Sequence, residues 1–350
     1  IDQSVYTYEY PTVSTSDCTL YVNGLEINDS SDQALRTLGG EVELYDVVVS
    51  GGGSGNQSTD GAVEIEYSSG APSVYVAGLT VSGHQTAPGL RISSSSSTEG
   101  SVSVTDAIIS GSGSYGIAVG PLPGSNNTFS EIESTGNASD GFYISDAEIA
   151  IGEEDTSDPA NNTAGLQSAY NTGHGLYMVD STVTAVELVL SDNIGSGAEI
   201  NNSSADLAYL TVASNGFGGA TPHDGITVTQ NASAILREAA ITGSAANGIV
   251  VDSNAIADID TVSSASNGLH GIEGTDATLS ISAVTLESNV LSGLNVTNCQ
   301  VDTLDSCSFT SNSEYGMVCD VASTFTTCSG NTFTTNTLGE SSGCEAVTCN

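Results

Sequence analysis

The dipeptide His223-Asp224 places a side chain that titrates near neutral pH beside a carboxylate, a combination used in general acid–base catalysis. It follows a glycine-rich stretch, 216–220, that interrupts an otherwise regular part of the sequence. Neighbours in sequence need not be partners in space, and Asp224 occupies the ordinary position directly before Gly225. We therefore interpret both residues as part of a loop and assign no catalytic residue from the sequence.

An acidic segment is the one candidate for binding a metal ion, and its four carboxylates are Glu153, Glu154, Asp155 and Asp158. Carboxylate oxygens are the ligands that Ca²⁺ takes in proteins, so Ca²⁺ is the only cofactor that the sequence suggests. The spacing does not fit the loop of an EF-hand. A solvated acidic loop explains the same residues, and in a chain this acidic we favour that interpretation.

Seven cysteines are present, and six of them lie in the last 52 residues: Cys299, Cys307, Cys319, Cys328, Cys344 and Cys349, with Cys18 far upstream. Zinc is disfavoured because the sequence has no Cys-x-x-Cys pair and no histidine at ligand spacing. Clustered cysteines in a chain rich in Ser, Thr and Asn are typical of disulfides formed in an oxidising compartment.

One disulfide can be proposed from spacing. Cys307 follows Leu304 by three residues and Cys328 follows Phe325 by three, which predicts a Cys307–Cys328 bridge between adjacent repeats. The remaining four cysteines of the cluster, at 299, 319, 344 and 349, are expected to pair among themselves. Cys18 is then left over, either buried or available to link subunits.

The elements that position these residues come from a repeat, a glycine that most often precedes a large apolar residue. The glycines lie at successive spacings of 27, 25, 34, 22, 28, 23, 23, 22 and 23 residues: Gly89, Gly116, Gly141, Gly175, Gly197, Gly225, Gly248, Gly271, Gly293 and Gly316. A fixed period in this range is the signature of a solenoid. The two long spacings, after Gly141 and Gly197, contain the acidic segment and His223-Asp224.

Within one repeat the apolar residues alternate with polar ones. The repeat that begins at Gly271 offers Ile272 for a first short strand, 277–281 for a second and 284–286 for a third. A period of two indicates strands, and the helical spacing i, i+3, i+4 is not sustained. Three short strands in about 22–23 residues form one coil, meaning one complete turn, of a β-helix. About a dozen coils, each ~4.8 Å from the next, would make a rod on the order of 55–60 Å long.

An asparagine four residues before the glycine marks the same turn in many coils: Asn137, Asn171, Asn193, Asn267, Asn289 and Asn312. An amide can donate and accept hydrogen bonds, so amides in equivalent turns can bond along the stack. We predict an asparagine ladder.

With its Asn-x-x-x-Gly-aliphatic coils, the chain resembles the right-handed parallel β-helix proteins, which include pectate-lyase-like enzymes and many surface proteins. The resemblance covers roughly residues 18–349 and implies an all-β, single-stranded, right-handed solenoid. It implies a β-helix over 18–350, with a disulfide-reinforced end at 299–350. Residues 1–17 are expected to form a strand that caps the solenoid, or a segment that contacts a neighbour.

The catalytic motifs of that group are missing. Gly173-His174-Gly175 looks like a motif of β-helical polygalacturonases, but the chain has no Asp-Asp pair and no lysine. His174 also holds the repeat position of His270, so we interpret the match as a coincidence of the repeat. A pectate lyase needs a basic residue, and the only candidates are Arg36, Arg91 and Arg237. A polyanionic substrate would also be repelled by so acidic a surface, so we do not expect lyase activity on acidic sugars.

The charge balance excludes several partners. Three arginines oppose 42 acidic residues, which gives a net charge of −39. Such a surface repels nucleic acid, anionic membranes and acidic polysaccharides. No apolar run of about 18 residues is present, so we expect no membrane insertion. The chain begins at Ile1 without a leader, as expected if a leader has been removed or if the chain is a piece of a longer protein; both fit secretion.

Sequons for N-glycosylation suit a secreted surface, and the candidates are Asn28, Asn56, Asn126, Asn161, Asn202, Asn231 and Asn295. Asn137 also lies in a sequon but is expected in the ladder.

Together these features favour an extracellular or cell-surface structural or adhesive protein, either a filament subunit or a module of a larger surface protein. Its expected partners are copies of itself, neighbouring surface proteins or surface glycans. The alternative is a polysaccharide-active enzyme with a site near 152–170 or 216–224, or a glycan-binding, tailspike-like module.

Overall fold

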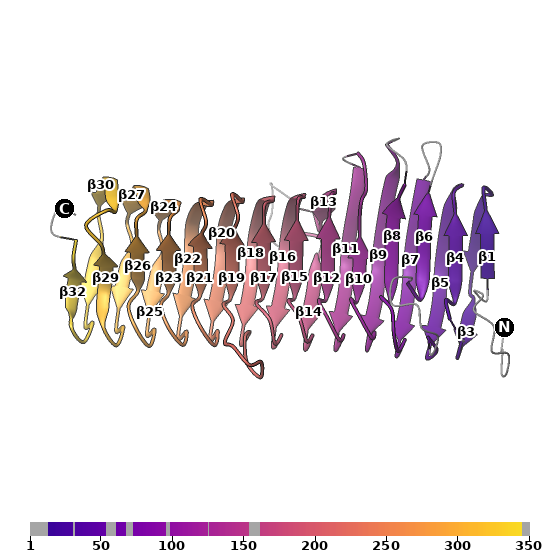
Figure 1. Ribbon diagram of the computed structural model, residues 1–350, viewed down its shortest axis with the longest axis horizontal. Helices are drawn as coiled ribbons and strands as arrows, with labels where there is room; N and C mark the ends of the chain where they lie inside the picture. The colour runs from indigo at the N-terminus through magenta and orange to yellow at the C-terminus, as the bar shows by residue number, and fades with distance from the viewer. Residues whose placement is uncertain are drawn as a thin grey trace. The chain divides into compact units, whose positions relative to one another are not determined.

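The computed structural model describes residues 13–30, 32–53, 61–67, 73–95, 99–124, 126–153 and 162–344, which contain strands and turns but no α-helix (Figure 1). The chain divides into two compact units, residues 1–187 and 188–350. No helix in the described part is long and apolar enough to cross a membrane.

The first unit contains two series of parallel strands. One series pairs in the order β1 (Val13–Ser16), β4 (Leu35–Leu38), β6 (Val63–Tyr67), β8 (Leu90–Ser94), β10 (Ile117–Val119), β12 (Phe142–Ser145) and β15 (Leu176–Val179). The other contains β2 (Leu20–Asn23), β3 (Glu26–Asn28), β5 (Val42–Ser50), β7 (Ser73–Ser82), β9 (Ser101–Ser110), β11 (Asn126–Thr135), β13 (Glu148–Ile151) and β14 (Leu166–Ala169), with β16 (Thr182–Ser191) at the unit boundary. Each strand pairs with its equivalent one coil later, which is the connectivity of a parallel β-helix.

The second unit repeats this plan. One series pairs in the order β17 (Ala198–Asn201), β19 (Ile226–Thr229), β21 (Ile249–Asp252), β23 (Ile272–Thr275), β26 (Leu294–Thr297), β29 (Tyr315–Cys319) and β32 (Gly339–Ser342). The other contains β18 (Ser204–Ala213), β20 (Ser233–Thr242), β22 (Ile256–Ala265), β24 (Thr278–Ser282), β25 (Thr285–Glu287), β27 (Gln300–Asp305), β28 (Ser308–Thr310), β30 (Thr324–Ser329) and β31 (Thr332–Thr334). The predicted all-β solenoid is therefore confirmed.

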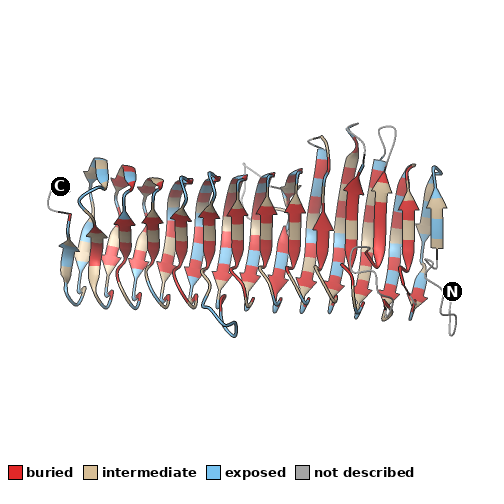
Figure 2. Cartoon of the chain, in the orientation of Figure 1, coloured by how far each residue is buried: buried red, intermediate tan, exposed pale blue. Residues whose placement is uncertain are grey.

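The core of each coil is made by the inward members of the alternating pattern (Figure 2). In β22, Ala257 and Ile259 are buried, and the left-handed residue Thr261 (φ 54°) then bends the strand so that Val262 is also buried. Where three short strands were expected per coil, many coils thus join the second and third into one bent strand. β24 and β25 stay separate, with Ala283 (φ 53°) between them.

The asparagine ladder is confirmed in both units. In the first, Asn137 Nδ2 donates to Asn171 Oδ1 at 2.8 Å. In the second, Asn193 donates to Asn215, and Asn267, Asn289 and Asn312 each donate to the next amide, ending at Asn336. Sequence spacing missed Asn215, because the segment 216–223 separates it from Gly225, and it missed Asn336, because no glycine–aliphatic pair follows.

The repeating glycine is explained by this ladder. A Cβ atom on Gly248 would lie 2.6 Å from the carbonyl oxygen of Gly271 and 2.7 Å from the amide of Asn267. Only glycine allows the chain to pass this close to the ladder of the next coil.

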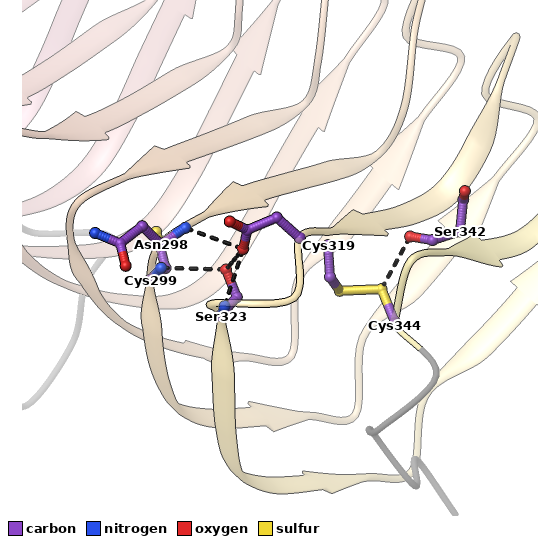
Figure 3. The surroundings of a disulfide bond; sticks show 7 residues. Asn298, Cys299, Cys319, Ser323, Ser342 and Cys344 are labelled. Carbon is purple, nitrogen blue, oxygen red and sulfur yellow. Dashed lines mark hydrogen bonds between the residues drawn. A yellow bond between two sulfur atoms is a disulfide. The ribbon is translucent and has the colours of Figure 1, made fainter.

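The predicted Cys307–Cys328 bridge is wrong. The structure has a disulfide between Cys319 and Cys344, with Cα atoms 5.0 Å apart (Figure 3). Cys307 is a free, buried thiol. The error lies in the register: Cys328 pairs with Leu304 across β27 and β30, whereas the turn that holds Cys307 faces Asn331.

The other cysteines are placed as follows. Cys299 is also free and buried, so the expectation that it joins a second bridge is wrong, and Cys18 is free and exposed. Cys328 is itself disulfide-bonded, and Cys349 lies outside the described residues. Residues 1–12 of the expected cap also lie outside them, whereas Val13–Ser16 form the first strand of the solenoid, β1.

Candidate functional site

Titratable side chains gather on one outward surface of the second unit, where the turns enter β17, β19, β21 and β23. We call this group the carboxylate–histidine cluster: Glu199, His223, Asp224, Asn247, His270 and Glu273. Asp224, Asn247 and His270 each directly precede a repeat glycine. Because β19, β21 and β23 pair in register, these three positions recur from coil to coil on the same side.

Asn247 joins two carboxylates. Its Nδ2 atom donates to Asp224 Oδ1 at 3.0 Å and to Glu273 Oε2 at 2.8 Å. The backbone N–H of Asn247 also donates to Asp224 Oδ1, at 2.8 Å. Its Oδ1 accepts from the backbone N–H of His270 at 3.0 Å, and the side chain is buried. The Asn247 amide thus bridges two acidic side chains, Asp224 and Glu273, which belong to different coils.

The environment favours the protonated forms of two carboxyl groups. Burial raises the pKa of Asp224 and the nearby charge of Glu273 raises it further, against the opposing effects of Asn247 and His223. Burial also raises the pKa of Glu199, and Asp252 adds to the effect, while Asn201 and His223 oppose it. Carboxyl groups with raised pKa values beside a charged partner are typical of functional sites.

His270 is held as a neutral ring. Burial lowers its pKa, although the charges of Glu273 and Glu314 oppose that shift. The backbone N–H of Ser292 donates to His270 Nδ1 at 3.2 Å, so the proton of the neutral ring belongs on Nε2.

His223 is positioned by the segment that lengthens its coil. Its backbone N–H donates to the Gly216 carbonyl at 3.4 Å, and its carbonyl accepts from Ala246 in the next coil at 3.0 Å. Gly216 has a left-handed backbone (φ 88°), and a Cβ atom there would lie 2.1 Å from the His223 carbonyl oxygen. The glycine-rich segment therefore closes on itself and places His223 beside the cluster.

The structure changes the interpretation of His223 and Asp224 as loop residues only. It groups them with Glu199, Asn247, His270 and Glu273, which sequence reasoning did not select as a site. The available signal was the position before the repeat glycine, where Asp224, Asn247 and His270 succeed one another.

The predicted calcium segment lies mostly outside the described residues, which include Glu153 but not Glu154, Asp155 or Asp158. The backbone of Glu153 pairs with that of Thr163 in an antiparallel bridge, with Thr163 N donating at 2.9 Å. Among the residues that the structure describes, no three His, Cys, Asp or Glu side chains are arranged to hold a metal ion. Calcium binding stays a prediction.

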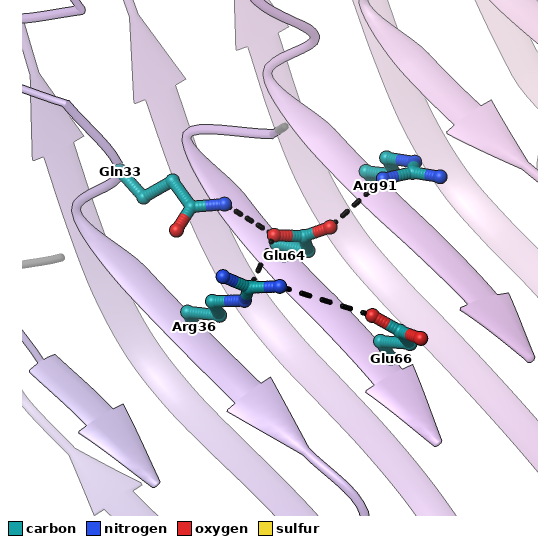
Figure 4. Close-up of polar contacts among 5 residues, drawn as sticks. All are labelled: Gln33, Arg36, Glu64, Glu66 and Arg91. Carbon is teal, nitrogen blue, oxygen red and sulfur yellow. Dashed lines mark hydrogen bonds and ion pairs between the residues drawn. The ribbon is translucent and has the colours of Figure 1, made fainter. Parts of the chain in front are cut away.

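The arginines lie in ion pairs. Arg237 pairs with Asp206 at 2.9 Å, and Arg36 and Arg91 both pair with the buried Glu64 (Figure 4). His174, from the Gly-His-Gly sequence, packs its ring against Tyr177, with centroids 5.4 Å apart. None of these groups is a member of the carboxylate–histidine cluster.

The sequons fall into three groups. Asn126, Asn202 and Asn231 are exposed, and Asn28 and Asn295 are half-buried. Asn56 and Asn161 lie outside the described residues. Glycosylation stays a prediction at all seven positions.

Comparison with known proteins supports the fold. A family model described as a right-handed beta helix region matches residues 224–350. A mutant of the periplasmic alginate epimerase AlgG is 12% identical, with a TM-score of 0.51 over 96% of this chain and 78% of that one. The mannuronan C-5 epimerase A-module of Azotobacter vinelandii is 13% identical (TM-score 0.38, 87% and 90% covered), and the catalytic domain of a GH87 alpha-1,3-glucanase is 10% identical (TM-score 0.46, 94% and 62% covered).

None of the curated protein sequences matches the chain significantly. Because these solved structures are only 10–13% identical to the chain in sequence, the similarity concerns the fold alone. The chain has the architecture of the right-handed parallel β-helix proteins. The repeat predicted the solenoid, and the resemblance to that group implied its handedness.

Proposed function

We propose that this chain is a polysaccharide-active β-helix protein that cleaves glycosidic bonds at the carboxylate–histidine cluster. The observation that carries the proposal is the Asn247 amide, which holds Asp224 and Glu273 together while the pKa of Asp224 is raised. Glycoside hydrolysis commonly uses two carboxyl groups in distinct protonation states.

Each carboxyl group then has a role. Asp224 Oδ1 accepts two hydrogen bonds from Asn247, which leaves Oδ2 to carry the proton that the leaving oxygen needs. Glu273, whose charge raises the pKa of Asp224, supplies the negative charge that stabilises the developing positive charge at the anomeric carbon. Asn247 positions both groups. The hydroxyl of a water molecule adds to the anomeric carbon, and the remaining proton of that water returns to Asp224.

The substrate we propose is a neutral polysaccharide. A net charge of −39 disfavours polyanions by long-range repulsion. That the fold is shared with a periplasmic alginate epimerase supports a polysaccharide as the substrate class and a location outside the cytoplasm.

A hydrolysis assay tests the proposal. The purified chain is incubated with soluble β-glucan, α-glucan, mannan and xylan, and new reducing ends are measured. We expect Asp224→Asn and Glu273→Gln each to lower turnover by at least ~10²-fold. Asp258→Asn, an exposed acid on β22, is the matched control and should keep full activity. Failure of the wild-type chain to cut any neutral glycan, or full activity in both variants, would refute the proposal.

A structural or adhesive role is the second candidate, and the exposed thiol of Cys18 favours it because such a thiol can link two chains. Under that reading, the chain assembles under oxidising conditions and Cys18→Ser abolishes the assembly. Electron microscopy with and without reductant, on the same preparations used for the hydrolysis assay, separates the two roles.

A further inference from the structure

A second group of side chains, in the first unit, is not used by the proposed chemistry. Arg36, Glu64, Arg91, Tyr143 and Tyr177 occupy one outward position on β4, β6, β8, β12 and β15. On β10, between Arg91 and Tyr143, the position is held by Ala118. We call these five residues, together with Tyr115, the Arg–Tyr row.

The aromatic end of the row is a continuous stack. Tyr115 and Tyr143 have ring centroids 4.6 Å apart with planes 23° from parallel. Tyr177 follows at 5.6 Å from Tyr143 with a 59° tilt. All three tyrosines are half-buried. Such rings present apolar edges and hydroxyl groups together, which suits ligands that are part apolar and part hydroxylated.

The polar end is held rigidly. Glu64 is only 1% exposed and accepts from Arg91 Nη1 at 2.8 Å and from the amide of Gln33 (Figure 4). Arg36 Nε lies 3.3 Å from Glu64 Oε2 and 3.9 Å separates Arg36 Nη2 from Glu66. Arg36 Nε is buried, and its contact with Glu64 is an ion pair without the geometry of a hydrogen bond. About a third of each arginine side chain stays exposed, at 32% and 33%.

The composition of the row selects one class of ligand. Glu64 and Glu66 balance the two guanidinium groups, so the row offers dense hydrogen-bonding groups without the net positive charge that a polyanion needs. None of the large hydrophobic side chains found exposed in the described residues belongs to it, whereas stable protein interfaces have an apolar centre. The row is one side chain wide and advances by one strand, about 4.8 Å, per coil.

From these features we propose that the Arg–Tyr row is a non-catalytic binding surface for a neutral polysaccharide that lies across the strands, along the row. Sugar C–H groups contact the tyrosine rings, and sugar hydroxyls bond with the tyrosine hydroxyls and the guanidinium groups. A linear polymer of hydroxylated rings matches a row that is narrow, carries no net charge when the neighbouring Glu66 is counted with it, and follows the strand spacing except at Ala118. The surface holds its ligand whether or not the carboxylate–histidine cluster is catalytic.

Affinity electrophoresis tests this with the whole 350-residue chain. Native gels contain laminarin, glucomannan, xylan or, as the anionic probe, alginate. We expect at least one neutral polymer to retard the chain and alginate not to do so. Tyr143→Ala and Arg91→Ala should each weaken the retardation by about tenfold or more, as for central binding residues. Tyr143→Phe, which keeps the ring, should lose much less.

Two controls keep the result specific. Tyr75→Ala removes a tyrosine from the stack on β5 and β7 instead and should bind like the wild type. Tyr177→Ala, at the end of the row, replaces Tyr143→Ala if thermal melting shows that the central variant is unfolded. Asp258→Asn, an exposed acid outside both sites, should bind as the wild type does. Because the readout is retardation and not turnover, a failed hydrolysis assay leaves this test intact.

The proposal is overturned if no neutral polymer retards the chain, or if alginate alone does. It is also overturned if folded Tyr143→Ala, Tyr177→Ala and Arg91→Ala bind like the wild type, or if the row captures a protein partner and no glycan.

Discussion

At the residue scale, the side chains that carry the proposed chemistry differ from their neighbours by how they are solvated. Asp224 and Glu199 are partly buried acids whose pKa values rise, and His270 is a partly buried base whose pKa falls. In all three the first cause is the loss of water around the charged form. Burial against the solenoid therefore favours the protonated form of Asp224 and Glu199 and the neutral form of His270.

His270 gives a prediction about acid stability. Its pKa is lowered in the folded state, so below the ordinary histidine value of about 6.5 the unfolded chain takes up a proton that the folded chain refuses. The stability that this group contributes is present above that pH and is lost as the pH falls through the folded pKa. His270→Asn, which keeps an acceptor for Ser292, should lose less stability between pH 7 and pH 5.

Thermal melting of wild type and variant across that range is the measurement. The pKa values of Asp224 and Glu199 are raised in the folded state, so their contribution to stability is lost as the pH rises through those folded values. Because both proteins contain these acids, the comparison uses the difference in stability between wild type and variant. Equal pH slopes for both would contradict the prediction.

At the element scale, the ladder ties one coil to the next. Asn289 is fully buried, donates to Asn312 Oδ1 at 3.0 Å and accepts from Asn267 Nδ2 at 3.0 Å. Asn289→Ala removes these bonds together with the one that the backbone N–H of Asn267 donates to Asn289 Oδ1, so that this buried N–H loses its partner. The loss costs on the order of 2–4 kcal/mol.

Urea unfolding measures that loss. Asn295→Ala, at a half-buried asparagine on β26 outside the ladder, is the control and should change the free energy of unfolding by about 0.5 kcal/mol or less. A ladder variant as stable as the control would show that the amides do not bind the coils together.

The elements also show what the sequence could reveal. The repeat glycines and asparagines predicted the coils and the ladder, because each lies at a fixed distance from a turn that is the same in every coil. Of the expected disulfides, Cys319–Cys344 joins two members of the set that was expected to pair, whereas Cys307–Cys328 was wrong. That error came from aligning Leu304 with Phe325 in place of Cys328. The cluster was not predicted, although Asp224 and Asn247 precede successive repeat glycines at an equal spacing. The spacing places them in neighbouring coils, but it does not show that the Asn247 amide bonds to Asp224 and to Glu273.

At the scale of the whole molecule, charge is the dominant property. Three arginines face 42 acids, so repulsion between carboxylates outweighs the few ion pairs. Salt screens this repulsion, and the folded chain holds its acids closer together than the unfolded chain does.

We therefore expect the melting temperature to rise by several degrees between about 0.05 M and 1 M NaCl, a change of about 1–2 kcal/mol in a chain of this size. Differential scanning calorimetry at both concentrations checks it. A fall in melting temperature would mean that the pairs of Arg36, Arg91 and Arg237 matter more than the repulsion.

The Cys319–Cys344 bond has a mechanical consequence. A solenoid pulled by its C-terminal end releases one coil at a time, and a released coil of about 23 residues lengthens the chain by roughly 75–80 Å. The bond joins cysteines separated by 25 residues, so the segment between them cannot extend while the bond is intact. Under tension the oxidised chain passes the load directly to the coils before Cys319, and reductant adds one more step of extension.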